Sequence, residues 1–233
     1  MKPLYIPRGK AKEYGDYAVN IYTGCPHRCY YCFAPSVLRK DREIFHSDVR
    51  PREGIVEALR SQLEREQITG KLVHLCFTCD PYPRGYDSST TREVIKVLKD
   101  AGNHVQILTK NPIQRDFDLL DENDWFGVTY DGGLNIGGAL PFLYMPILET
   151  AKKRGIKTWI SFEPVVNDGA VLKYIEFAAK CGCVDKVKIG RLNYHPSYIN
   201  WKRFGHEVEN LCKELGVDYY IKESLRAEME KEK

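Results

Sequence analysis

The sequence lacks any apolar run that approaches membrane-spanning length, and residues 1–8 lack the apolar core of a signal peptide. We therefore expect a cytoplasmic protein with no membrane partner. The net charge is only +3, which is too mild to indicate a nucleic-acid partner by itself. No G-x-G-x-x-G follows a strand-like segment, which argues against a dinucleotide-binding sheet. The 233 residues show no repeat and no low-complexity segment, so we expect one domain, 1–233, with its core at about 17–222.

Cysteine, by contrast, is abundant and clustered: there are 8 cysteines, and Cys25, Cys29 and Cys32 are spaced C-x3-C-x2-C. Without a secretion signal, clustered cysteines more often bind metal or do redox chemistry than form a disulfide framework. A four-iron cluster held by three thiolates keeps one iron open for a substrate or cofactor. The alternative is a zinc site with His27 or His46 as the fourth ligand, but structural zinc usually pairs two C-x2-C-like elements.

Short apolar strands alternate with amphipathic helices along the chain. The predicted strands are Tyr17–Tyr22, Lys71–Phe77, His104–Leu108, Trp125–Thr129, Lys157–Phe162, Lys186–Ile189 and Asp218–Ile221. The predicted helices are Pro51–Gln67, Ser88–Ala101, Pro141–Arg154, Asp168–Ala179 and Ile199–Leu215, with Lys222–Lys233 as a final helix or a frayed end. This alternation predicts an α/β fold of six to seven parallel strands with outer helices, as an open or closed barrel. A flat, doubly wound sheet is the alternative.

Nearly every predicted strand is followed by a polar or ionisable group. Ligands bind at the carboxyl ends of the strands in α/β barrels and open α/β sheets alike. The segments at these ends are the cysteine loop, Phe77–Tyr82, Thr109–Pro112, Thr129–Gly133, Ser161–Pro164, Gly190–His195 and Lys222–Glu223. Their convergence on one rim indicates an enzyme. We interpret the stretch with Gly132, Gly133, Gly137 and Gly138 as a flexible loop on the substrate side.

The segment Gly24–Phe33 resembles the cluster loop of the radical S-adenosylmethionine (SAM) enzymes. Four later segments look like the spore photoproduct lyase-like branch of that superfamily, in the same order: Phe77–Pro83, Thr90–Arg92, Ile107–Lys110 and Arg115–Leu120. Ser161–Pro164 and Tyr219–Lys222 are similar to a phage-associated, uncharacterised radical-SAM-like family. The resemblance implies a radical SAM partial TIM barrel with a [4Fe–4S] cluster and SAM. It also implies an external electron donor, such as flavodoxin or ferredoxin, and reductive cleavage of SAM to a 5′-deoxyadenosyl radical that abstracts hydrogen from a substrate.

The same resemblance implies roles for individual residues. Cys25, Cys29 and Cys32 would ligate three irons. The residues implied to contact SAM are Tyr31, Phe33, Thr78, Cys79 and Asp80. Lys110 and Thr129, at the following strand ends, are interpreted as partners of the SAM carboxylate. Tyr31 and Cys79 are also the candidate catalytic residues, and Cys79 is interpreted as a hydrogen-atom donor or a SAM contact.

Two further candidates lie at the ends of later strands. Glu163 is interpreted as a substrate or ribose contact, or as an ion-pair partner of Lys222 or Arg191, because an unpaired buried carboxylate is costly. Asn193 is expected to contact the substrate or the adenosine, and His195 to cap a turn. Cys76 is expected to be a buried strand residue, on the opposite face from Cys79 if the strand continued through both. The other cysteines are interpreted as core or turn thiols: Cys181, Cys183 and Cys212.

Departures from the lyase pattern leave the substrate open. Phe33 stands where the lyase has a tyrosine, Phe77 stands where it has a donor cysteine, and the Gly-Gly-Glu of many radical SAM proteins is absent. A nucleic acid or nucleotide substrate competes with a peptide or a small metabolite. Basic residues in the first quarter hint at phosphates, and a solvated basic face is the alternative: Arg8, Lys10, Lys12, Arg28, Arg39, Lys40, Arg42, Arg50 and Arg52. A non-catalytic iron–sulfur or zinc-binding barrel is the alternative outside enzymes. We expect a monomer.

Overall fold

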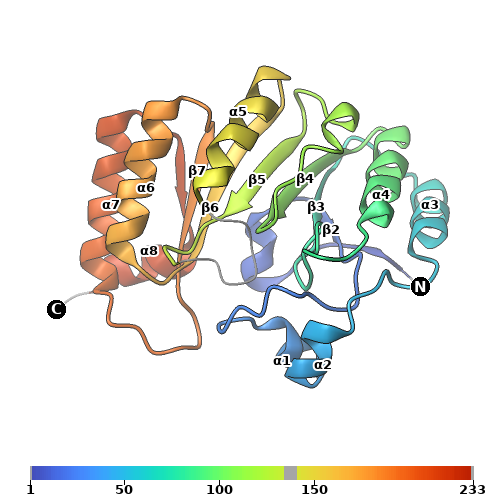
Figure 1. The fold of residues 1–233 in the computed structure, drawn as a ribbon, viewed down its shortest axis with the longest axis horizontal. Coiled ribbons are helices and arrows are strands. Elements are labelled where there is room, and N and C mark those ends of the chain that lie inside the picture. The colour runs from blue at the N-terminus through green and yellow to red at the C-terminus, as the bar shows by residue number, and fades with distance from the viewer. Residues whose placement is uncertain (1, 134–140, 232–233) are drawn as a thin grey trace.

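Eight strands form one sheet in which the spatial order follows the chain order (Figure 1). The computed structural model describes residues 2–133 and 141–231. The strands are β1 (Leu4–Tyr5), β2 (Tyr17–Val19), β3 (Leu72–Leu75), β4 (His104–Thr109), β5 (Trp125–Thr129), β6 (Lys157–Val165), β7 (Lys186–Arg191) and β8 (Tyr219–Ile221). β1 pairs antiparallel with β2, and every later pair is parallel. A doubly wound sheet requires the strand order to reverse, and here it never does. β8 does not pair with β1 among these residues, so the barrel is partial.

Helices follow the strands and pack outside the sheet (Figure 1). The α-helices are α1 (Ala34–Leu38), α2 (Arg42–Ser47), α3 (Ile55–Glu66), α4 (Ser89–Asp100), α5 (Tyr144–Lys153), α6 (Asp168–Cys181), α7 (Trp201–Leu215) and α8 (Glu223–Met229). The 3-10 helices are η1 (Gly9–Glu13), η2 (Phe117–Leu119) and η3 (Pro141–Leu143). No helix in the described ranges is both long and apolar enough to cross a bilayer. α1 and α2 lie apart from the outer layer and follow the cysteine loop directly (Figure 1).

The seven predicted strands and five predicted helices are all present, with differences at their ends. β1, α1 and α2 are additional, and the tail forms α8. The largest error concerns Cys76, which was expected inside a strand. β3 ends at Leu75, and Cys76 takes a left-handed φ of 69°. The side-chain oxygen of Asn20 then accepts hydrogen bonds from the backbone N–H groups of Phe77 and Thr78, at 2.8 and 2.9 Å. Because the strand stops, the face of Cys79 cannot be extrapolated from strand alternation.

One aromatic side chain fills the interior of the open barrel. Tyr14 follows η1, and its ring centroid lies 4.9 Å from that of His74 on β3 and 6.1 Å from that of Trp159 on β6. The ammonium of Lys188 on β7 lies 3.7 Å from the centre of the same ring. Gly127 on β5 makes room for Trp159, since a Cβ there would lie 2.2 Å from the indole nitrogen. The N-terminal segment thus ties the two halves of the sheet together where strand pairing does not.

The burial of His74 predicts an acid-sensitive fold. Burial is the main cause that lowers the pKa of His74 from 6.5 to about 3; Gln106 opposes the shift, and the charges of Lys188 and Lys222 add to it. His74 therefore stays neutral in the folded protein while the unfolded chain takes up a proton below pH 6.5. The contribution of neutral His74 to the free energy of unfolding is therefore complete above pH 6.5. It is lost as the pH falls towards 3, by about 1.4 kcal/mol per pH unit.

The measurement is urea unfolding at pH 7 and pH 5 for the wild type and His74→Gln. We expect the wild type to lose about 2 kcal/mol more stability between these pH values than His74→Gln does. His206→Gln, which replaces an exposed histidine on α7, should behave like the wild type. An equal pH dependence in the wild type and His74→Gln would contradict the expectation.

Candidate active site

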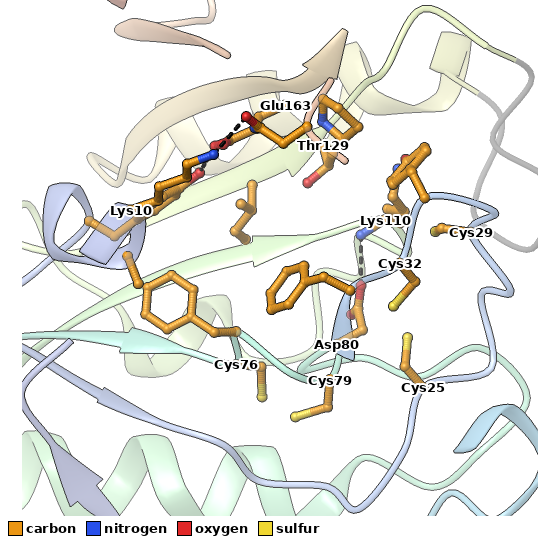
Figure 2. Close-up of a pocket in the computed structure, with 18 of the residues that line it drawn as sticks. Lys10, Cys25, Cys29, Cys32, Cys76, Cys79, Asp80, Lys110, Thr129 and Glu163 are labelled. Atoms are coloured by element: carbon orange, nitrogen blue, oxygen red, sulfur yellow. Dashed lines mark hydrogen bonds between the residues drawn. The ribbon is translucent and has the colours of Figure 1, made fainter. Parts of the chain in front are cut away.

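A cavity of about 470 Å³ opens at the carboxyl ends of the strands (Figure 2). Nearly all the predicted site residues line it, although they come from the cysteine loop and the ends of five strands, β3 to β7: Cys25, Cys29, Tyr31, Cys32, Phe33, Cys79, Asp80, Lys110, Thr129, Glu163 and Asn193. The exception is Thr78, which is buried but is not part of the wall. This volume is in the range of small-molecule sites.

The cysteine loop is folded tightly against α2. A Cβ on Gly24 would lie 2.2 Å from the carbonyl oxygen of Phe45, so only glycine fits there. The backbone N–H of Cys25 donates to the same carbonyl at 3.2 Å, and that of Cys32 donates to the carbonyl of Cys29 at 3.0 Å. Burial is the main cause that raises the pKa of all three thiols. A bound cation would supply the positive charge that holds them as thiolates.

The number of thiols in the loop bears on the kind of metal group it can hold. Cys25, Cys29 and Cys32 all line the same cavity. Structural zinc usually takes four protein ligands, whereas a four-iron cluster held by three thiolates keeps one iron open. The donor set therefore fits a [4Fe–4S] cluster.

The two histidines weighed as zinc ligands have other partners. The Nε2 of His27 lies 3.1 Å from a carboxylate oxygen of Asp80, and both side chains are buried. The Nδ1 of His46 lies 2.7 Å from the carbonyl oxygen of Cys25. His27 thus anchors the cysteine loop to Asp80 from within the loop, and His46 holds it from α2.

Asp80 holds several elements of the site together. Its carboxylate accepts hydrogen bonds from the hydroxyl of Thr109 at 2.6 Å and from the backbone N–H groups of Lys110 and Tyr82, at 2.9 and 2.8 Å. Burial alone would raise the pKa of Asp80, but the charge and hydrogen bond of His27 and the other donors lower it overall. Contact with SAM remains a prediction for Asp80.

A pair of charges faces the cysteine loop from the ends of β4 and β5. The ammonium of Lys110 lies 3.3 Å from a carboxylate oxygen of Asp131 and 5.5 Å from the centre of the Tyr31 ring. The hydroxyl of Tyr31 donates to the same carboxylate oxygen. Burial would raise the pKa of Asp131, but Lys110 and Tyr31 lower it. Sequence reasoning missed Asp131, although its position two residues after a strand, before Gly132, was a usable signal.

The polar side chains in the wall across the cavity from the cysteines also have partners. Glu163 forms an ion pair with Lys222 at 2.8 Å and accepts a hydrogen bond from the hydroxyl of Tyr14 (Figure 2). Arg191, the other partner considered for Glu163, pairs with Glu228 instead. The amide oxygen of Asn193 accepts a hydrogen bond from the ammonium of Lys10 at 2.6 Å.

Cys76 and Cys79 are both in the cavity wall, which corrects the expectation that they face opposite sides (Figure 2). The Cys79 sulfur accepts the backbone N–H of Tyr22 at 3.4 Å. Cys183 and Cys212 are buried, as expected of core thiols, whereas Cys181 is exposed at the end of α6. Among the described residues, none of these three cysteines belongs to a group of side chains close enough together to hold a metal ion.

The mouth of the cavity is bordered by aromatic side chains. His195, which was expected to cap a turn, packs edge-to-face on Tyr30 of the cysteine loop, with ring centroids 5.6 Å apart. Tyr194 is 85% exposed, and the ammonium of Lys10 lies 4.9 Å from the centre of its ring. Of the glycine stretch, Gly133 donates its backbone N–H to Asp131 at 2.8 Å. Gly137 and Gly138 lie outside the described residues.

Comparison with solved structures finds proteins that share this architecture. A single-residue variant of spore photoproduct lyase matches with a TM-score of 0.73, at 11% identity, over 93% of this chain and 80% of that one. SuiB from Streptococcus suis bound to S-adenosylmethionine matches with a TM-score of 0.65, at 11% identity, over 88% of this chain and 50% of that one. At this identity the likeness concerns the fold alone.

Sequence comparison finds relatives whose own names state no activity. Uncharacterized protein Rv2578c from Mycobacterium tuberculosis (strain ATCC 25618 / H37Rv) is 32% identical over 123 residues, which cover 50% of this chain and only 36% of that protein. Uncharacterized protein MJ0683 from Methanocaldococcus jannaschii is 26% identical over 188 residues, which cover 75% of this chain and 68% of that protein. The family model of the radical SAM superfamily matches residues 19–180. The match includes the three cysteines and the strand ends from β3 to β6, and the chain therefore belongs to the radical SAM superfamily.

Proposed function

We propose that this protein is an enzyme that holds a [4Fe–4S] cluster on Cys25, Cys29 and Cys32 and binds SAM in the cavity beside it. The observation that carries the proposal is that the three thiols of the C-x3-C-x2-C loop share a cavity with Lys110, whose ammonium pairs with Asp131. When bound, the cluster and SAM together supply a reductively formed 5′-deoxyadenosyl radical for hydrogen abstraction. An external electron donor such as flavodoxin or ferredoxin would deliver the electron, and we propose that the chain works as a monomer.

The chain's own residues would bind and orient the ligands. Lys110 is proposed to hold the carboxylate of SAM, with Thr129 as a hydrogen-bond donor beside it. Tyr31, with its hydroxyl fixed on Asp131, presents a rigid ring to the adenine side together with Phe33. The remaining proposed SAM contacts are Thr78, Cys79, Asp80, Glu163 and Asn193. Cys79 also lies in the cavity wall, where a thiol can donate a hydrogen atom to a substrate radical.

The first test is iron binding. Cys25→Ala, Cys29→Ala and Cys32→Ala should each lose most of the iron and the iron–sulfur absorbance after anaerobic reconstitution, because three ligands are the minimum for such a site. Cys181→Ser, at an exposed cysteine outside the cavity, should keep both. The wild type with dithionite and SAM should form 5′-deoxyadenosine. A wild type that binds zinc or an inert cluster and forms none would support the non-catalytic alternative.

The second test concerns Lys110. Lys110→Met should weaken SAM binding about tenfold to a hundredfold, which corresponds to loss of a hydrogen bond to a charged group, while the iron content stays unchanged. Lys180→Met, at an exposed lysine of α6, is the matched control and should bind SAM normally. Equilibrium dialysis with labelled SAM measures both. Unchanged SAM affinity in Lys110→Met would show that Lys110 serves only to neutralise Asp131.

For the substrate we propose a nucleic acid or nucleotide. Tyr194 and Lys10 offer a ring to stack on and a charge at the mouth of the cavity, which suits a base and a phosphate. A spore photoproduct lyase in complex with a dinucleoside spore photoproduct shares this fold, with a TM-score of 0.71. A peptide or small metabolite is the alternative, and SuiB bound to its precursor peptide SuiA also shares the fold, with a TM-score of 0.65.

Binding to short single-stranded DNA and RNA tests this choice. Anisotropy should show binding at low salt that weakens as salt rises. Tyr194→Ala should lose about fivefold to a hundredfold in affinity, the usual loss for one base stacked on an aromatic ring. Tyr198→Ala, at another exposed tyrosine of the same loop, should not. Absence of binding at low salt would contradict a nucleic-acid substrate and leave a peptide or metabolite as the candidate.

A further inference from the structure

The outer side of the cysteine loop is held by basic side chains from residues 40–46. The guanidinium of Arg42, on α2, donates hydrogen bonds to the carbonyl oxygens of Cys29, of Tyr30 at 3.0 Å and of Cys32 at 3.3 Å. Lys40 and His46 bind two further carbonyl oxygens of the loop segment, those of Thr23 and Cys25, at 2.9 and 2.7 Å. One arginine therefore contacts two of the three ligand cysteines and a residue between them.

These contacts orient the peptide groups of the loop. In a planar trans peptide the C=O and the N–H point in opposite directions. When carbonyl oxygens turn outward to a guanidinium, the N–H groups of the same peptides turn towards the sulfur side. For the three carbonyls that Arg42 holds, these are the N–H groups of Tyr30, Tyr31 and Phe33. Such donors stabilise negative charge on thiolates.

The helix does not need Arg42 for its own start. α2 is capped by Asp41, whose carboxylate accepts the backbone N–H of Ile44 at 3.0 Å. The arginine instead extends back to the loop and holds three of its carbonyl oxygens. It is exposed to solvent, so its charge acts on the loop partly screened.

We propose that Arg42 is a positioning residue that raises the reduction potential of the cluster. This inference rests on the proposed function, because it assumes that the three cysteines hold a [4Fe–4S] cluster. Reduction adds negative charge to an anionic site, and a nearby cation with inward-facing N–H groups stabilises the reduced form. Lysine at this position keeps a charge but offers no planar fork for three carbonyl oxygens.

The experiment is an anaerobic redox titration of the reconstituted full chain, followed by electron paramagnetic resonance. Arg42→Gln should lower the ratio of reduced to oxidised cluster at a fixed potential about fivefold. This corresponds to a midpoint potential lower by about 40 mV, since a tenfold change in the ratio is 59 mV for one electron. Arg42→Lys should fall between Arg42→Gln and the wild type. The matched control is Arg39→Gln, at the exposed arginine that follows α1. Among the described residues its side chain has no hydrogen bond to the loop, and its ratio should change less than twofold.

The outcomes separate this inference from the proposed function. A wild type that holds no reducible cluster overturns the proposed function. If the wild type holds a cluster but the midpoint potential of Arg42→Gln shifts no more than that of Arg39→Gln, only the role of Arg42 is overturned. If Arg42→Gln loses its iron, Arg42→Lys decides: a midpoint below that of Arg39→Gln supports the role, and a midpoint equal to that of the wild type overturns it.

Discussion

The buried carboxylate of Asp80 is the interaction on which the geometry of the site depends. It is 6% exposed and joins three parts of the chain: the cysteine loop through His27, the turn after β3 through Tyr82, and the end of β4 through Thr109 and Lys110. A buried charge with so many donors is stable only while all of them are in place, and removing one partner of a buried pair typically costs about 3–5 kcal/mol. The position of Lys110 relative to the cysteines is therefore fixed by Asp80 and not by strand pairing alone.

The sequence was sufficient to predict the order of elements, because strand and helix periodicities are local properties. It was also sufficient for the rim, since carboxyl ends of parallel strands meet at one edge of the sheet. β1 and α1 were missed because elements of two and five residues carry no period. The left-handed turn at Cys76 was missed because its cause is remote: the amide of Asn20 captures two N–H groups after β3. The hydrogen bond from Tyr31 to Asp131 joins residues 100 positions apart, and no local pattern reveals it.

The wall opposite the cysteines shows how an open barrel tolerates buried charge. Lys188 and Lys222 both lie over the ring of Tyr14, at 3.7 and 4.6 Å from its centre. Burial, followed by repulsion from Lys222, lowers the pKa of Lys188 to about 8. Glu163 neutralises Lys222 directly and also accepts the hydroxyl of Tyr14. A ribose or substrate contact by Glu163 must therefore be made with the oxygen lone pairs that Lys222 and Tyr14 leave available.

The two sides of the cavity differ in how strongly the fold constrains them. On the cysteine side, Arg42 and His46 hold the loop from α2, Asp80 holds it through His27, and the Lys110–Asp131 pair faces it. At the mouth, Tyr194 and Phe33 are exposed, at 85% and 49%, and Tyr194 is restrained mainly by Lys10. Phe33 has no hydroxyl to lose, so it cannot take over the radical-transfer role that the lyase resemblance assigns to a tyrosine. A shared fold at 11% identity does not determine a shared substrate, because the side chains at the mouth of the cavity are those the fold constrains least.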